Sequence, residues 1–227
     1  MLKFYFNGSP NPTKVALFLE EAGLAYEPIP VDVRRGEQFD PAFMALNPNA
    51  KVPVLLDGDV RIFDSNAILL YLAEKTGKFL PDADPGSRAE LLSWLMFVAT
   101  GVGPYMGQAV HFRQFALKDN SYAQQRYQFE GKRHWKILDE RLRTRTYLLG
   151  ETYSIVDMAA WGWARALGLG LGEESWEEFP DLKRWFNHIS ARPAALRAGQ
   201  LKDRFVFKTE FDAEARRHMF KHATPED

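Results

Sequence analysis

The sequence predicts two unequal parts, a small α/β domain followed by an all-α domain, and three observations support this. Strand-like and helix-like patterns alternate over residues 1–77. Residues 78–86 lack periodicity and contain two prolines and two aspartates. The apolar patterns after residue 87 have a helical period. We therefore expect a first domain at 1–77, a linker at 78–86 and a helical domain with a charged tail at 87–227.

The first elements form a βαβ unit. Leu2 to Phe6 is short, apolar and aromatic, as expected of a strand. Turn formers follow at 7–12, and an apolar stripe then predicts a helix that ends at Gly23. Tyr26 to Val33 is the second strand. A single helix between two strands indicates a right-handed parallel crossover.

The rest of the first domain completes the order β-α-β-α-β-β-α. A tight Asp57-Gly58 turn between two apolar runs predicts an antiparallel hairpin, and Gly77 stops the helix that follows it. The expected elements are a helix at Pro41 to Leu46, strands at Val54 to Leu56 and Val60 to Phe63, and a helix at Ser65 to Thr76.

The remaining chain is predicted to be helical. A helix begins near Ser87, and Gly101, Gly103 and Pro104 are expected to kink or break it. The charged stretch Lys202 to Asp227 is expected to wrap the surface or to fray. Further helices are indicated by apolar stripes at Tyr127, His134, Leu138 and Leu142, at Ile155, Met158, Ala159, Gly162, Trp163 and Ala166, and at Leu182, Trp185, Phe186 and Ile189.

Composition excludes several classes of function. With 29 basic and 30 acidic residues the formal net charge is -1, so no global field attracts nucleic acid. No apolar run of about 18 residues and no cleavable leader is seen, and we expect a cytoplasmic protein without a membrane partner. The absence of cysteine excludes disulfides, thiolate metal ligands and a cysteine nucleophile. We expect no metal, since the spacing of His134, His188, His218 and His222 relative to acidic residues suggests no ligand set.

Two loops could together bind a short peptide. A cis bond before Pro53 would present the Val52 N–H and C=O to a ligand, although an ordinary trans proline at a strand start is an alternative. Asp64 and Ser65 immediately precede a helix, where a hydroxyl and free N–H groups can bind a carboxylate. A simple helix cap would also explain that serine.

The element order, Lys51-Val52-Pro53, Phe63-Asp64-Ser65 and the helical second half resemble the glutathione transferases over essentially the whole chain. The resemblance implies a thioredoxin-like first domain, a cis proline at Pro53, and the glutamyl end of glutathione at Asp64 and Ser65. The box at 154–157 resembles the helix cap of that family, whose role is in folding.

Shorter motifs are similar to those of the bacterial Nu class, whose members are glutathione-dependent disulfide-bond oxidoreductases. They are Ser9-Pro10-Asn11, Gly36-Glu37-Gln38-Phe39, Asn47-Pro48-Asn49, the run 67–77 and Gly107-Gln108. By this resemblance the residues that contact glutathione would be Asn11, Gln38, Val52, Asp64 and Ser65, together with Lys51 and Pro53 of the same loop as Val52. Arg126 would approach the ligand from the helical half.

The sulfur must arrive with the ligand, and the site must ionise it. A free thiol has a pKa of about 8.5. Lowering this pKa by about one to two requires that the site favour the thiolate over the thiol by about 1.4 to 2.7 kcal/mol. Donors at the start of the first helix could do this together with the helix dipole. Asn11 is the first candidate and Ser9 the second, with Thr13 as a backbone donor. Tyr5 is the rival, and ordinary turn chemistry is the alternative for the loop.

The expected reaction is reduction of a small disulfide, in which bound glutathione attacks and a second glutathione resolves the product as glutathione disulfide. The second site would lie near residues 101–112, with His111 and Phe112 as wall residues. One alternative is conjugation of an electrophile in an apolar pocket lined by Trp94, Phe97 and Tyr105. Another is a non-catalytic glutathione-binding protein. The resemblance also implies a homodimer.

Overall fold

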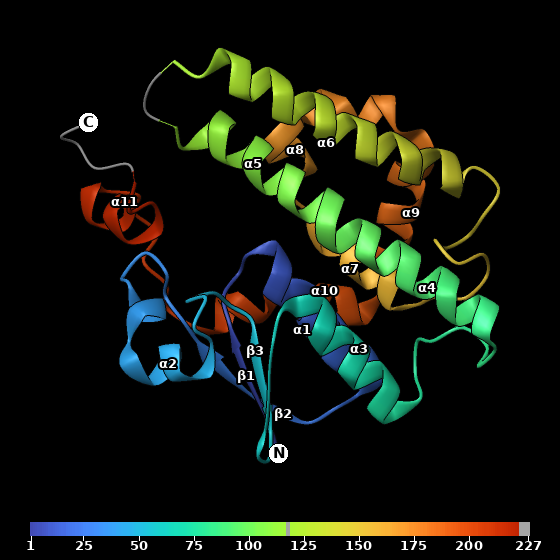
Figure 1. Ribbon diagram of the computed structural model, residues 1–227, viewed down its shortest axis with the longest axis horizontal. Helices are drawn as coiled ribbons and strands as arrows, with labels where there is room; N and C mark the ends of the chain where they lie inside the picture. Colours follow the sequence, from blue (N-terminus) through green and yellow to red (C-terminus); the bar gives the residue numbers. More distant parts are fainter. Residues whose placement is uncertain (117–118, 223–227) are drawn as a thin grey trace.

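A four-stranded mixed sheet lies in the first part of the molecule. The computed structural model (Figure 1) describes residues 1–116 and 119–222. The end of the expected charged tail, 223–227, lies outside these ranges. The strands β1 (Leu2–Phe6), β2 (Tyr26–Pro30), β3 (Val54–Asp57) and β4 (Val60–Phe63) lie in the order β2-β1-β3-β4. β1 pairs with β2 in parallel and with β3 antiparallel, which confirms the βαβ unit and the hairpin.

The second strand is shorter than the sequence indicates. β2 ends at Pro30, not at Val33, because the chain turns at Asp32, whose carboxylate accepts a hydrogen bond from the Arg34 N–H at 3.0 Å. Its two prolines are compatible with the edge position that this strand takes in the sheet.

Both faces of the sheet are covered. The helices α1 (Pro10–Ala22) and α3 (Ser65–Thr76) pack on one face, where Phe4 and Phe6 are buried. The short α2 (Pro41–Leu46) packs on the other, where Phe43 contacts Tyr5 with ring centroids 5.9 Å apart. Gly23 and Gly77 end α1 and α3 in the left-handed conformation, as their positions predict.

The second part is helical throughout. α4 begins at Pro85, capped by Asp84, so the last two residues of the expected linker belong to this helix. The further elements are α4 (Pro85–Phe97), the π-helical turn η2 (Val98–Val102), α5 (Gly103–Gln114), α6 (Ser121–Leu142), α7 (Ile155–Ala164), α8 (Leu167–Leu171), α9 (Pro180–Ser190), α10 (Pro193–Gln200) and α11 (Ala213–Met219), with 3₁₀ turns at Glu37–Phe39, Glu173–Glu178 and Leu201–Arg204. None of the helices within the described ranges is long and apolar enough to cross a membrane.

The break expected at residues 101–104 is the π-helical turn between α4 and α5. A Cβ at Gly101 would lie 2.5 Å from Nε2 of His134, and one at Gly103 would lie 2.9 Å from Nε1 of Trp163. Glycine at both positions therefore lets the turn approach α6 and α7 closely.

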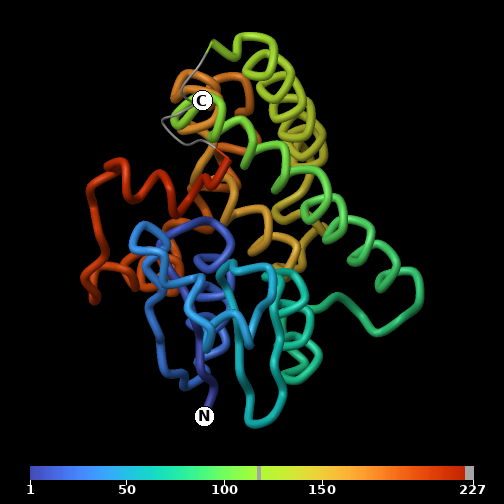
Figure 2. Tube along the Cα trace, turned by 60° about the vertical axis from the view of Figure 1, so that its left-hand side comes forward, coloured from blue at the N-terminus to red at the C-terminus, as the bar shows by residue number. Residues whose placement is uncertain are grey.

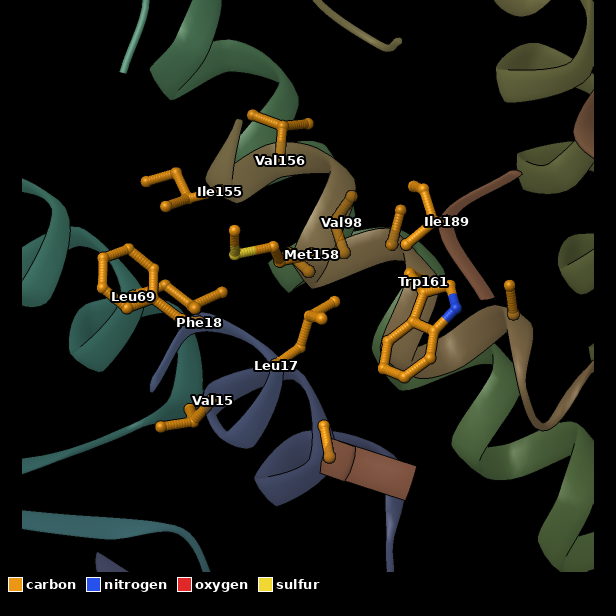
Figure 3. Close-up of a cluster of buried hydrophobic side chains, with 14 of the residues drawn as sticks. Val15, Leu17, Phe18, Leu69, Val98, Ile155, Val156, Met158, Trp161 and Ile189 are labelled. Atoms are coloured by element: carbon orange, nitrogen blue, oxygen red, sulfur yellow. The ribbon is translucent and has the colours of Figure 1, made fainter. Parts of the chain in front are cut away.

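The two parts share one core, centred on the contact between α1 and α7 (Figure 3). Leu17 and Phe18 of α1 meet Met158 and Trp161 of α7 in this core. The helices approach closely because α7 has Gly162 at the crossing, where a Cβ would lie 2.7 Å from the Pro10 carbonyl oxygen. The halves are thereby fixed relative to each other.

The expected cap of α7 is present. Ser154 Oγ accepts from the Val156 N–H at 3.2 Å, and Asp157 accepts from the Ser154 N–H at 3.0 Å. The same carboxylate accepts from the Leu148 N–H at 2.8 Å and from Trp185 Nε1 at 2.9 Å. Burial raises the pKa of Asp157 to about 6. One carboxylate thus joins three segments in the helical half.

The C-terminal segment, which we define as residues 202–222, follows the surface of the first domain before it reaches α11 (Figure 2). The rings of Phe205 and Phe207 lie 5.4 and 6.1 Å from that of Phe6. The Lys208 N–H donates to Asp32 Oδ2 at 2.6 Å. Of the two behaviours expected of the tail, the structure therefore shows wrapping.

Candidate functional site

A cleft of about 350 Å³ opens where the first domain meets the helical half. Its position follows from the topology, because β1 ends at the same edge of the sheet at which the antiparallel β3 begins. The cleft is lined from the first domain by Asn11, Lys14, Lys51, Asp64, Ser65 and Asn66, and from the helical half by Val98, Ala99, Gly103, Pro104, Gly107, Gln108 and Trp163. Four of the predicted site residues, Asn11, Lys51, Asp64 and Ser65, are thus brought together.

The peptide bond between Val52 and Pro53 is cis, as the resemblance implies. Just before it, the Lys51 carbonyl accepts a hydrogen bond from Asn47 Nδ2 at 2.7 Å. Asn47 is buried, so this contact holds the loop against the interior of the domain. The backbone of Val52 is therefore held at the start of β3, beside the cleft.

Asn11 and Ser65 join the starts of two helices. The Ser65 hydroxyl, which is buried, donates to Asn11 Oδ1 at 3.3 Å. The adjacent Asp64 has a positive φ of 72° and caps α3, accepting from the N–H groups of Asn66 at 2.8 Å and Ala67 at 3.1 Å. With Oδ1 of Asn11 occupied, its Nδ2 remains as a donor.

The first turn of α1 offers few backbone donors. Pro10 and Pro12 have no N–H, and the Thr13 N–H donates to the Ser9 carbonyl at 3.2 Å. The Thr13 hydroxyl donates to the same carbonyl at 2.8 Å. Thr13 is therefore not placed as the backbone donor that the sequence suggests, and the N–H of Asn11 is the one left to face a ligand.

The two other candidates near this helix lie outside the cleft. The Ser9 hydroxyl donates to Asn7 Oδ1 at 2.6 Å, and Ser9 lines a different hollow, together with Arg34 and Phe205. Tyr5 points to the opposite face of the sheet, against Phe43. The geometry thus favours Asn11 over both.

Gln38 is predicted to contact the ligand, but the structure places it under the C-terminal segment. Its side chain is 4 % exposed, and its Nε2 donates to the carbonyls of Val33 at 3.3 Å and His218 at 3.2 Å. The long-range partner, His218, could not be inferred from the local motif. Arg126 also does not line the cleft. Its Nη1 pairs with Glu130 Oε1 at 2.8 Å on α6.

Only part of the segment expected to form the second-substrate site lines the cleft. From residues 101–112, the lining residues are Gly103, Pro104, Gly107 and Gln108. His111 instead packs on Phe220, with ring centroids 4.6 Å apart, and burial lowers its pKa. Phe112 stacks on Tyr127 at 5.3 Å.

The aromatic residues expected to line a conjugation pocket are packing residues instead. Phe97 and Tyr105 lie on the ring of His134, with centroids 5.2 and 4.9 Å away. Trp94 lies under the Arg141 guanidinium at 4.1 Å. The aromatic wall of the cleft is Trp163, which the sequence marked only as part of an apolar stripe.

A larger groove of about 730 Å³ lies on the other side of the loop 7–9. It follows the ends of the parallel strands β1 and β2, and the C-terminal segment closes it. Its lining includes Ser9, Arg34, Phe205, Phe207 and Met219. The loop that carries Ser9 thus separates two spaces at the same edge of the sheet.

Within the ranges described, no group of three or more His, Asp or Glu side chains is arranged to hold a metal ion. The acidic residue of the cleft, Asp64, is committed to capping α3.

Comparisons with known proteins agree with this architecture. The family model for the glutathione S-transferase N-terminal domain matches residues 1–74, and that for the C-terminal domain matches residues 100–193. The disulfide-bond oxidoreductase YfcG of Escherichia coli is 41% identical over 218 residues, which cover 89% of this chain and 98% of that protein. The E. coli disulfide-bond oxidoreductase YghU is 37% identical over 213 residues, covering 86% of this chain and 73% of that protein.

Two solved structures are similar over most of the chain. A glutathione transferase from Burkholderia graminis, with two glutathione molecules bound per subunit, has a TM-score of 0.84 and 37% identity, covering 90% of this chain and 89% of that one. One from Pseudomonas putida, with one glutathione disulfide bound per subunit, has a TM-score of 0.83 and 36% identity, covering 88% and 91%.

Proposed function

Because this chain belongs to the glutathione S-transferase family, we propose that it is an enzyme that reduces disulfide bonds with glutathione. The observation that carries the proposal is the cleft itself, in a chain without cysteine. It combines the backbone of Val52, in the loop just before the cis proline, with donors at the starts of two helices. Backbone N–H and C=O groups in such a loop can pair with a peptide, and helix starts bind anionic groups.

In this proposal, glutathione lies with its glutamyl end at Asp64 and Ser65 and its peptide backbone along Val52. Lys51 lies beside that backbone, and the cis bond before Pro53 sets the course of the loop. The thiol then reaches the start of α1, where the N–H and the Nδ2 of Asn11 donate to the sulfur. Charge-assisted hydrogen bonds of this kind favour the thiolate.

The reaction needs two glutathione molecules. The bound thiolate attacks one sulfur of the substrate disulfide, which forms a glutathione mixed disulfide and releases the other sulfur as a thiolate that takes up a proton. A second glutathione thiolate then attacks the mixed disulfide at the glutathione sulfur. The second substrate thiol leaves, and glutathione disulfide is the oxidised product.

The arrangement of the two hollows supports this sequence of steps. The cleft of about 350 Å³ takes the first glutathione, and the groove of about 730 Å³ beyond the loop 7–9 gives room for the disulfide or the second glutathione. The similar Burkholderia protein binds two glutathione molecules per subunit. We assign Ser9, at the boundary, a secondary part in holding the sulfur.

The roles of Gln38, Thr13 and Arg126 at the ligand are also proposals, and each depends on a further condition. Gln38 can reach a ligand only if α11 moves, and Thr13 acts through the Ser9 carbonyl that it holds. Arg126 would approach the ligand from the helical half if its guanidinium left Glu130, with which it pairs. We also propose a homodimer and a cytoplasmic location, as the sequence predicts.

Turnover of two substrates tests the function. With glutathione supplied, we expect the purified protein to reduce hydroxyethyl disulfide much faster than it conjugates chlorodinitrobenzene. Faster conjugation would contradict the proposal and favour a conventional transferase. Calorimetry that detects no binding of glutathione or its disulfide at millimolar concentration would instead indicate a non-catalytic protein.

A further inference from the structure

A buried lysine lies in the floor of the glutathione cleft. Lys14 is one turn after Asn11 on α1 and lines the cleft, although its side chain is only 1 % exposed. Its ammonium donates to Asn66 Oδ1 at 2.9 Å, which is the one hydrogen bond that the described residues give it. An ammonium has three N–H donors, so two are left without a protein acceptor.

No carboxylate within the described ranges forms an ion pair with Lys14. The other charged side chains that line the cleft are Asp64, at the start of α3, and Lys51, in the loop before Val52. The parts of α7 and of the π-helical turn that face it, including Gly162 and Val98, are uncharged. Asp64 favours the charged ammonium, but burial outweighs it and lowers the pKa of Lys14 to about 7.

A buried charge without a counterion is costly, by several kcal/mol as an order of magnitude. A ligand that supplies the opposite charge would offset this cost. Lys14 lines the cleft together with Asn11 and Ser65, so an anion bound there could accept from the two N–H donors that have no protein acceptor.

We propose that Lys14 is the counterion of bound glutathione, and that its ammonium donates hydrogen bonds to an anionic group of the ligand, the thiolate or the glutamyl carboxylate. The inference rests on the proposed function and adds a ligand-binding residue to its site. When the ligand binds, Lys14 takes up a proton from solvent. If its partner is the thiolate, this uptake offsets the proton that the thiol releases.

Lys14→Met and Lys14→Arg test the inference, with the exposed Lys136→Met as the matched control. Methionine has a similar shape without the charge, and arginine keeps the charge. Ultraviolet absorbance of the thiolate, followed against pH with glutathione bound, gives the pKa of the bound thiol. Calorimetry with S-methylglutathione, which has no thiol, gives the affinity for the rest of the ligand.

We expect Lys14→Met to change one of two quantities, and Lys14→Arg to restore it. If the partner is the thiolate, the pKa of the bound thiol rises by about 1 to 3. If the partner is the carboxylate, the affinity for S-methylglutathione falls by about tenfold or more. A Lys14→Met protein that matches Lys136→Met in both quantities would overturn the inference.

A measurement on the unaltered protein covers the case in which Lys14→Met does not fold. Near pH 7 a binding thiol that ionises fully releases about one proton, and a half-protonated Lys14 takes up about half of one. Calorimetry of glutathione binding in buffers of different ionisation enthalpy should therefore give a net release well below one proton. Release of a full proton would contradict the role of Lys14, whereas absence of any binding would contradict the proposed function instead.

Discussion

At the scale of single residues, the site depends on the way Asn11 is held. The Ser65 hydroxyl occupies Oδ1 of Asn11, and the prolines on either side remove the neighbouring N–H donors. The amide group and the N–H of Asn11 are therefore the donors that remain at this end of α1. A side chain fixed in this way can stabilise a sulfur anion without further ordering when the ligand binds.

Asn11→Ala should lower turnover more than binding. Loss of the amide removes a charge-assisted hydrogen bond to the thiolate, and a pKa rise of one to two corresponds to about a 10- to 100-fold loss of thiolate near neutral pH. Steady-state kinetics with hydroxyethyl disulfide and calorimetry with glutathione measure the two effects. Asn187→Ala, at an exposed position on α9, is the control. Unchanged kinetics would move the role to Ser9.

Gln38→Ala distinguishes the predicted contact with glutathione from the contact with α11. Since Nε2 of Gln38 donates to the His218 carbonyl, we expect the variant to release the C-terminal segment and to speed tryptic cleavage near Arg216. Gln125→Ala, exposed on α6, should leave the cleavage rate unchanged. A loss of glutathione affinity without faster cleavage would show that Gln38 acts on the ligand directly.

Local signals were sufficient for the residues whose role depends on their own element. The turn before α1 and the cap of α3 at Asp64 and Ser65 are visible in the sequence because turn and cap residues mark them, whereas the choice of Asn11 and the cis bond before Pro53 came from the resemblance. Lys14 and Trp163 were not recognised as cleft residues, and the contact of Gln38 with α11 was not expected, because their partners are Asn66, Gly103 and His218. Those contacts join segments far apart in the chain.

At the scale of secondary structure, caps and one irregular turn determine the geometry of the site. Asp64 caps α3 beside Ser65, and the π-helical turn brings the start of α5 to the cleft. The sequence predicted that the long helix breaks near Gly101 but not the kind of break. Its form depends on His134 and Trp163, which lie on other helices.

Asp157→Ala should be among the most destabilising substitutions in the helical half. It leaves the N–H groups of Leu148 and Ser154 and the indole N–H of Trp185 without their acceptor in the core. We expect a loss of about 3 to 5 kcal/mol in the free energy of unfolding. Ser154→Ala, which removes only the cap, should cost about 1 kcal/mol. Urea denaturation measures both, and equal losses would contradict the joining role of Asp157.

At the scale of the whole molecule, a single core through α1 and α7 holds the cleft between two dissimilar halves (Figure 3). The first domain supplies one wall of the cleft, and the helical half supplies the opposite wall. The order of strands and the division into two parts follow from periodicity and turn residues. The course of the C-terminal segment does not follow from these signals. It depends on Phe205 and Phe207, which pack on Phe6 at the other end of the chain.

Sedimentation tests the proposed homodimer. In the proposed dimer a second copy would cover Met96 on α4 and Phe63 at the end of β4, which are each 45% exposed. We expect a dimer, and Met96→Asp should shift it toward the monomer. Leu196→Asp, at an exposed position on α10, should not. A monomeric unaltered protein would contradict the proposal.

The most direct test of the central claim is a crystal structure of the protein with glutathione disulfide. One glutathionyl half should lie in the cleft, with its backbone along Val52, its glutamyl group at Ser65 and its sulfur at Asn11. The other half should extend past the loop 7–9. Density for the ligand only elsewhere, or a cleft filled by the protein's own side chains, would contradict the account.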